Sequence, residues 1–174
     1  IYYIGASRSA LPVQFAGNAA LLERTPKLLA LCSQGAGYDA IDVEACTRAG
    51  VLATNQAGGN AEAVAEHALA MMLSLSKRIP EIDRHMRRQA GIRREQFMGH
   101  DVLGKTVGLI GIGHVGTRLA ELCRGLLRMR VLAVDPYLNA AQITTRGAQP
   151  VSLDALLEQS DFVCVCCPLT NESE

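Results

Sequence analysis

The stretch "GKTVGLIGIGHVGTRLAELCRG", residues 104–125, holds the residues whose types and spacing most directly indicate chemistry. A short apolar run at residues 107–112 predicts a buried strand, and Gly111, Gly113 and Gly116 predict a turn at its end. Apolar residues then recur at the i, i+3, i+4, i+7 spacing of one helix face: Leu119, Leu122, Cys123 and Leu126. A strand, a glycine turn and a helix are therefore expected in succession.

Each glycine has a separate physical role in such a turn. Gly111 permits a tight change of direction, Gly113 leaves room for a phosphate to approach the backbone, and Gly116 lets the helix pack against the strand. The first N–H groups of a helix have no partner within it, and the helix dipole adds partial positive charge there. We therefore expect this turn to bind a pyrophosphate.

An acid after the next predicted strand indicates which pyrophosphate compound binds. Residues 130–134 predict a second buried strand, and Asp135 follows at 135 − 116 = 19 residues beyond Gly116. A carboxylate about 20 residues after the turn binds the adenosine ribose, accepting from a free 2′-hydroxyl and repelling a 2′-phosphate. NAD is therefore favoured over NADP, and Pro136 and Tyr137 add no positive charge. A methyltransferase that binds S-adenosylmethionine remains an alternative on these residues alone.

The composition bounds the kind of protein. The chain has 174 residues, of which 49% are hydrophobic and 20% charged, and its formal net charge is zero. These values are ordinary for a globular chain that forms one large domain or parts of two. A neutral chain is not expected to bind nucleic acid or a membrane surface, and no apolar run reaches the ~18 residues of a membrane span.

The chain contains six cysteines: Cys32, Cys46, Cys123, Cys164, Cys166 and Cys167. Three of them lie in "FVCVCCPL", which is typical of a buried parallel strand. We expect small apolar residues of a core in a reducing, cytoplasmic compartment, rather than metal ligands or disulfides.

The first third of the chain alternates strands and a helix. Strands are expected at "IYYIG", at residues 28–32 and at "GVLAT", with a short helix from about residue 43 to 48. This order predicts a small parallel sheet. Further on, Ser152 is expected to cap a helix through Leu157, ahead of a strand at residues 162–167. That makes three strands of a doubly wound fold that needs about six, so the sequence is expected to stop within a domain.

Residues 61–75 predict a helix, with Asn60 as its cap and Pro80 as the residue that ends or kinks it. The middle of this helix is apolar nearly all round, so we expect it to be buried between two layers or two subunits. The arginine-rich residues 84–94 are expected to form a solvated connecting helix.

Several motifs together resemble the D-isomer-specific 2-hydroxyacid dehydrogenases, especially those like D-3-phosphoglycerate dehydrogenase. They are "GAGYDAID", "NAEAVAEHALAMMLSLSKRI", "LGKTVGLIGIGHVG", "MRVLAVDPYL", "VSLDALLEQSDF" and "CPLTNE", in family order. The resemblance displaces the methyltransferase alternative. It implies part of a flavodoxin-like substrate-binding domain at residues 1–58 and the first portion of a Rossmann-type NAD-binding domain at residues 59–174, with the boundary near Gly58–Gly59.

The resemblance also implies roles for individual residues. Within the turn from Gly111 to Gly116, backbone groups of Gly113, His114 and Val115 would face the pyrophosphate, and Asp135 the ribose. Three residues match positions on the adenosine side of the pocket: Cys167, Pro168 and Ser173. The family usually has arginine in place of His114 and often has histidine in place of Cys166, so this chain departs from the family pattern at both.

In the substrate domain, the amides of Ala36 and Gly37 match those that hold the substrate carboxylate, and Asn60 lies beside the nicotinamide end. The implied reaction is hydride transfer between NAD and a D-2-hydroxy acid or 2-keto acid. The arginine, histidine and acid that serve it in the family would all follow residue 174, so none of the four histidines here is expected to be catalytic. The 174 residues alone are not expected to form a complete enzyme.

The family commonly dimerises through its NAD domain. The resemblance therefore implies a homodimer in which residues 60–97 make most of the contact, Met72 among them. A second class of function stays open, an NAD-binding corepressor or scaffold of the same superfamily that needs no turnover. The missing catalytic groups and a measured turnover would distinguish the two.

Overall fold

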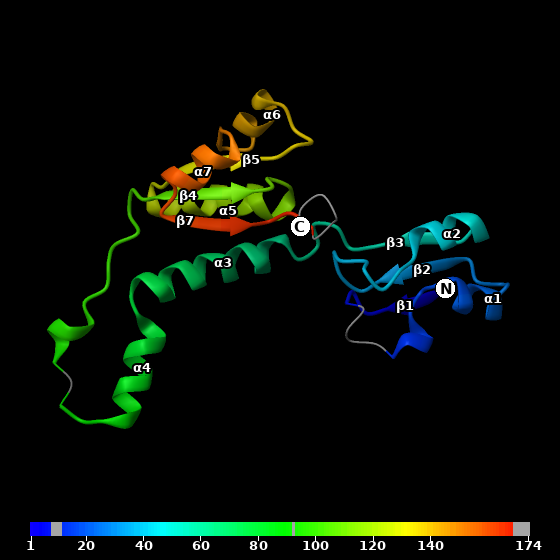
Figure 1. Ribbon diagram of the computed structural model, residues 1–174, viewed down its shortest axis with the longest axis horizontal. Coiled ribbons are helices and arrows are strands. Elements are labelled where there is room, and N and C mark those ends of the chain that lie inside the picture. Colours follow the sequence, from blue (N-terminus) through cyan, green and yellow to red (C-terminus); the bar gives the residue numbers. More distant parts are fainter. Residues whose placement is uncertain (8–11, 92, 169–174) are drawn as a thin grey trace. The chain divides into compact units, whose positions relative to one another are not determined.

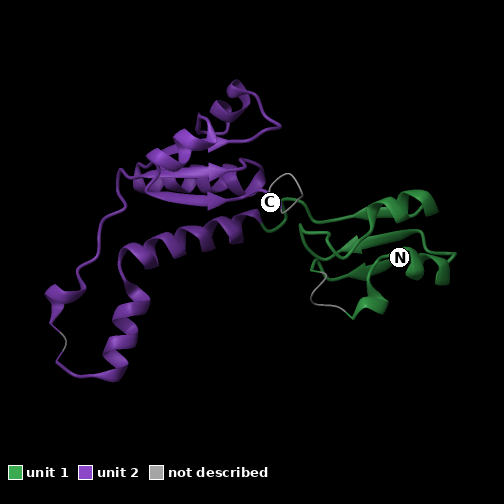
Figure 2. Ribbon diagram, viewed as in Figure 1, with its two compact units in different colours: residues 1–60 green, residues 61–174 purple. Residues whose placement is uncertain are grey.

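The structure is a computed structural model that describes residues 1–7, 12–91 and 93–168. It divides into two compact units, residues 1–60 and residues 61–174, which Figure 2 draws in different colours. Each unit has its own parallel sheet and its own hydrophobic core. The predicted α/β class with parallel sheets is therefore confirmed.

The first unit is built on a sheet of order β1-β2-β3, with strands Tyr2–Ile4, Ala30–Ser33 and Leu52–Thr54. The described parts of the connections contain three short helical segments: η2 (Val13–Phe15), α1 (Ala19–Arg24) and α2 (Val43–Ala49). Side chains of Asn18 and Asp42 cap α1 and α2 by accepting backbone N–H bonds. The strands and the helix expected here are confirmed, with β2 beginning two residues later than the apolar pattern predicted.

The second unit contains a parallel sheet of order β6-β5-β4-β7 (Figure 1). Its strands are β4 (Thr106–Ile110), β5 (Arg130–Val134), β6 (Gln149–Pro150) and β7 (Phe162–Val165). The chain runs outward from β4 to β6 and then returns past β4 to form β7, so the strand order reverses between β4 and β7. This is the start of the Rossmann order 3-2-1-4-5-6, in which ligands bind at the reversal. The three expected strands are confirmed; the two-residue β6 was not predicted.

Helices cover both faces of this sheet. Val107 and Leu109 of β4 share a core with Leu119 and Cys123 of α5 (His114–Leu127). A Cβ on Gly108, between them, would lie 2.4 Å from both Leu156 Cδ2 and Ser160 Oγ. Because neighbouring residues of a strand point to opposite faces, α5 and α7 (Leu153–Gln159) lie on opposite sides of the sheet.

The buried face of α5 differs by one residue from the buried face that the sequence predicted. Leu119 and Cys123 are fully buried, but Leu126 is 65% exposed and Ala120 is buried in the core instead. In the last turn of α5 it is Leu127 that packs against this core, so the neighbouring Leu126 points away from it. Helix α6 (Ala140–Thr145), with a capping box from Asn139 and Gln142, was not predicted.

Helix α3 (Ala61–Ser76) packs on α5 along one face only. Ala65 and Met72 are buried in the unit's core, whereas Val64, Met71 and Leu75 are exposed. The prediction that this helix is buried all round is therefore wrong within the chain. The placement of Met72 in a subunit contact is also wrong, because its side chain is 4% exposed and belongs to the core.

An ion pair fixes α3 to α5. The Arg118 guanidinium donates to both carboxylate oxygens of Glu62, with Nη2–Oε1 at 2.8 Å, and also bonds Glu121. The hydrogen bond from Arg118 lowers the pKa of Glu62. Glu62 therefore holds α3 beside the helix that begins at the glycine turn.

Pro80 starts a helix instead of interrupting one. Helix α3 ends at Ser76, Arg78 has a left-handed φ of 54°, and α4 (Ile79–Arg88) begins with Pro80 in its first turn. Within the described ranges, no helix has the length and apolar character that a membrane crossing requires.

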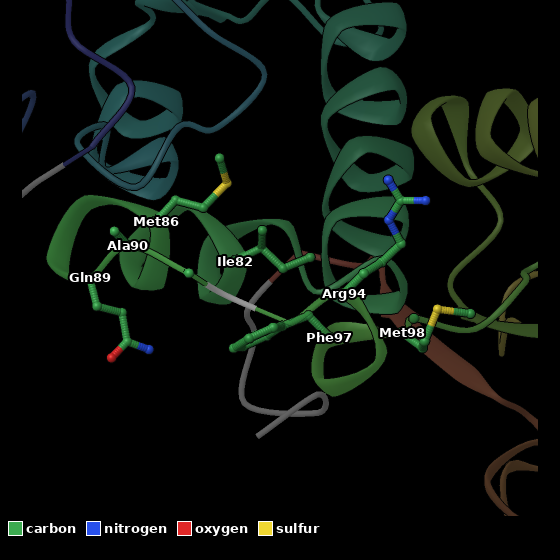
Figure 3. A pocket seen from close by; sticks show the side chains of 9 residues that line it. Ile82, Met86, Gln89, Ala90, Arg94, Phe97 and Met98 are labelled. Carbon is green, nitrogen blue, oxygen red and sulfur yellow. The ribbon is translucent and has the colours of Figure 1, made fainter.

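The chain after α4 returns through η3 (Arg94–Phe97) and forms a groove of about 730 Å³ with α4. The Phe97 ring contacts both the His85 ring, at 4.8 Å between centroids, and the Arg78 guanidinium, at 5.5 Å. Figure 3 displays the apolar side chains around the groove: Ile82, Met86, Phe97 and Met98. Helix α4 itself buries no residue.

Candidate functional site

The glycine turn lies where β4 ends and α5 begins, at the reversal in strand order. Gly111 has φ +89°, and a Cβ there would lie 3.0 Å from the backbone N of Cys167 at the end of β7. A Cβ on Gly116 would lie 2.5 Å from the carbonyl oxygen of Gly111. Both positions therefore require glycine for backbone reasons. A Cβ on Gly113 would meet nothing within 4 Å, so this glycine faces open space.

The open side of the turn is the positive end of α5. Gly113 is the N-cap and makes no side-chain cap bond, and the first helical bond runs from Thr117 N to Gly113 O at 2.9 Å. The N–H groups of His114, Val115 and Gly116 precede that bond and have no acceptor within the helix. No acidic residue occupies the first turn. The arrangement suits an anion.

Asp135, directly after β5, is hydrogen-bonded to this turn. Its Oδ2 accepts from the N–H of Ile112 at 3.0 Å, and its Oδ1 accepts from the N–H of Tyr137 at 3.0 Å. Each carboxylate oxygen has two lone pairs, so each keeps one for a further donor. Asp135 is half-buried, which leaves part of the carboxylate accessible to hydroxyl groups.

The end of β7 forms the other wall. Cys166 N donates to Ile110 O at 2.8 Å, which extends the pairing of β7 with β4 by one residue. Burial, and then the neighbouring Cys164 and Cys167, raise the pKa of Cys166 to about 11, so this thiol is protonated at neutral pH. Cys167 is half-buried beside Gly111, and Pro168 is exposed. Ser173 lies outside the described residues.

A second candidate site is the loop at residues 35–37 in the first unit. All three carbonyl oxygens accept bonds from the protein: Gly35 O from Gln56 N at 3.0 Å, Ala36 O from Asn55 Nδ2 at 2.8 Å, and Gly37 O from Ser33 Oγ. In a trans peptide, the N–H points opposite to the C=O of the same unit. The N–H groups of Ala36 and Gly37 are therefore turned away from those donors, and among the described residues neither has a backbone acceptor.

Sequence reasoning found the turn, Asp135 and the loop but missed the side chains that hold them. Asn55 and Ser33 fix the loop carbonyls, and Thr117 and Arg146 bond the carbonyl oxygen of Ile112. The only signal for Asn55 was a polar residue directly after an expected strand. Asn60 is exposed and immediately precedes α3.

The comparisons with known proteins identify this arrangement. A family model described as D-isomer specific 2-hydroxyacid dehydrogenase, NAD binding domain, matches residues 69–174. The chain belongs to this family. Among its relatives, D-3-phosphoglycerate dehydrogenase of Archaeoglobus fulgidus is 37% identical over 90% of this chain and 29% of its own length. Glyoxylate reductase of Korarchaeum cryptofilum is 34% identical over 90% of this chain and 48% of its own length.

A solved structure in the family has the same fold. The crystal structure of D-lactate dehydrogenase from Aquifex aeolicus, complexed with NAD and lactic acid, has a TM-score of 0.78 and 28% identity. The match covers 95% of this chain and 53% of that chain. The chain thus spans 29% of the first of these curated relatives and about half of the solved structure.

The family's cofactor, NAD, fits the residues present. The open side of Gly113 and the uncapped start of α5 leave room and unpaired donors for a pyrophosphate, and Asp135 has free lone pairs beside them. Where many family members have arginine, the exposed His114 stands at the start of α5. Where they often have histidine, this chain has Cys166, whose Cβ would lie 3.7 Å from a Cβ placed on Gly116.

We predict that two alanine substitutions in the turn act on different properties, one on NAD affinity and the other on stability. Gly113→Ala should fold like the parent but weaken NAD binding by about 1–3 kcal/mol, because the new methyl group occupies the side from which a phosphate approaches. Gly116→Ala should lower the free energy of unfolding by a similar amount, because its Cβ meets the backbone oxygen of Gly111 at 2.5 Å. Calorimetry and urea denaturation measure the two effects. Equal NAD affinity for parent and Gly113→Ala would contradict the role of Gly113.

Proposed function

We propose that the whole protein is an NAD-dependent oxidoreductase that transfers a hydride between the nicotinamide and a D-2-hydroxy acid or 2-keto acid. The observation that carries the proposal is the uncapped, open start of α5 with Asp135 bonded to the turn that precedes it. This pairing supplies donors for a pyrophosphate and acceptors for ribose hydroxyls on adjacent strands. The second unit would be the NAD-binding portion and the first unit part of a substrate-binding domain.

The proposed roles follow from the backbone N–H groups and carboxylate lone pairs that have no partner among the described residues. The N–H groups of Gly113, His114 and Val115 would bind the pyrophosphate. Asp135 would accept hydrogen bonds from the ribose, and Cys167, Pro168 and Ser173 would line the adenosine side. NAD, when bound, supplies the hydride acceptor. The six thiols are free, which agrees with a cytoplasmic location.

The substrate carboxylate would bind the N–H groups of Ala36 and Gly37, with Asn60 beside the nicotinamide end. Two N–H groups fixed by Asn55 and Gln56 are positioned before the substrate arrives, so little entropy is lost in orienting them. Holding the carboxylate also fixes the adjacent C2 atom, from which the hydride leaves. Proton transfer is not assigned to any described histidine.

Turnover of the full-length protein tests this proposal. NADH formation should be observed with the D enantiomer of one or more 2-hydroxy acids, and not with the L enantiomer. D-3-phosphoglycerate and D-lactate, each compared with its L enantiomer, and the achiral glycolate form a suitable panel, because the relatives above are named for these acids or for their keto acids. NAD binding without turnover on any of the panel would favour a corepressor or scaffold and contradict the enzymatic proposal.

Asp135 should set the preference for NAD over NADP. Asp135→Ala removes the acceptor for the ribose hydroxyls and the charge that repels a 2′-phosphate. NAD affinity should fall by about 1–3 kcal/mol, the usual cost of losing hydrogen bonds to a charged group, while NADP affinity changes less. Asp135→Asn is the matched control that keeps one acceptor without the charge. Unchanged NAD affinity of the alanine variant by calorimetry would remove Asp135 from the ribose site.

We also propose a homodimer, to which residues 60–97 contribute most of the contact. Large apolar side chains are exposed along this segment: Val64, Met71, Leu75, Ile79 and Met86. The groove beside Met86 and Phe97 continues the apolar surface over α4. Exposed apolar area of this extent is typical of interaction surfaces. A second copy of the chain would supply self-complementary cover around a two-fold axis.

A pair of glutamate substitutions tests the dimer. Met86→Glu should yield monomers, because it places an unpaired charge within the proposed contact. Leu126→Glu is the control, because Leu126 is 65% exposed, close to the 69% of Met86, but lies on α5 outside the segment. Light scattering should find a dimer for the parent and for Leu126→Glu. A monomeric parent at micromolar concentration would contradict the proposal.

A further inference from the structure

The peptide that joins Ile112 to Gly113 is held by side chains from two other positions. Its carbonyl oxygen accepts from Arg146 Nη1 at 2.6 Å and from Thr117 Oγ1 at 3.2 Å. Ile112 is fully buried, and Arg146 is half-buried. Away from water, a hydrogen bond from a charged guanidinium is stronger than one between neutral groups. Arg146 is therefore the stronger of the two constraints on this peptide.

The direction of that bond determines where the next N–H points. The Ile112–Gly113 peptide is trans, so the Ile112 C=O and the Gly113 N–H lie in one plane and point in opposite directions. Arg146 pulls the carbonyl toward α6 and thereby turns the Gly113 N–H away from it. Gly113 is exposed, and the space beside its Cα is open. The N–H that begins the positive end of α5 is thus oriented by a residue that lies 34 positions after Ile112 in the sequence.

Arg146 is itself fixed in place. It follows α6 as the C-cap, and its backbone N–H donates to carbonyl oxygens of the last turn. The buried Ile143 fastens this short helix to the core. Among the residues that the structure describes, no carboxylate forms an ion pair with Arg146. Residues 107–117 contain no lysine or arginine, so Arg146 brings a positive charge to this turn, where the Asp135 carboxylate bonds the N–H of the same residue, Ile112.

We propose that Arg146 is a positioning residue for the cofactor pyrophosphate: it holds the Ile112–Gly113 peptide so that the Gly113 N–H faces the phosphate oxygens. The inference rests on the proposed function, since it concerns the same nucleotide site. It predicts a selective loss, because only ligands that contain the pyrophosphate depend on this N–H. Adenosine contacts Asp135 and the β7 side but carries no phosphate.

The test compares NAD, ADP and adenosine on the full-length protein by calorimetry. Arg146→Met should weaken NAD and ADP by the same factor, roughly tenfold, as expected for a charged hydrogen bond, and leave adenosine unchanged. Arg146→Lys should retain most of the affinity, because an ammonium still donates one bond. Arg130→Met is the control, because Arg130 bonds Gln149 at the opposite end of β5. This variant should bind all three ligands like the parent.

Each outcome separates this inference from the proposed function. A parent protein that binds neither NAD nor ADP would overturn the proposed function itself. A parent that binds both, with Arg146→Met unchanged, would overturn only the role of Arg146. An equal loss of affinity for adenosine would mean that Arg146 has a general structural role, and it would also overturn the proposed positioning role. If Arg146→Met does not fold, Arg146→Gln, which is neutral and too short to reach the Ile112 oxygen, gives the same comparison.

Discussion

The hydrogen bond from the Ile112 N–H to the Asp135 carboxylate is the contact on which the nucleotide site depends. It joins the turn after β4 to the end of β5 at 3.0 Å, and so sets the separation between the proposed pyrophosphate donors and the proposed ribose acceptor. The turn can form only because Gly111 has φ +89° and Gly116 lets α5 begin beside it. Substituting either glycine would displace the start of α5 and the Asp135 contact together.

Both candidate sites use the same physical device. Protein donors occupy the backbone carbonyl oxygens, and the N–H groups of the same peptides are thereby directed outward. At residues 35–37 the donors are Gln56, Asn55 and Ser33; at Ile112 they are Thr117 and Arg146. Such fixed N–H groups suit anions, and the ligands we propose are a carboxylate in one unit and a pyrophosphate in the other.

Local patterns in the sequence were sufficient for the turn, for Asp135 and for most strands, because spacing within about twenty residues determines them. Contacts between distant residues were not predictable: Arg146 and Ile112 are 34 positions apart, and nothing in a single sequence pairs them. Periodicity also misplaced Leu126 and overestimated the burial of α3, since it reveals which residues are apolar but not what covers them. The two-residue β6 is too short to produce a pattern.

The central claim is that the start of α5 binds the pyrophosphate of NAD. Nuclear magnetic resonance of the full-length protein, labelled with ¹⁵N-glycine, tests it most directly, because each glycine amide reports separately. Addition of NAD should shift the Gly113 amide resonance strongly and leave that of Gly125, near the far end of α5, nearly unchanged. Adenosine should shift Gly113 much less than NAD does. An unchanged Gly113 resonance at saturating NAD would contradict the account.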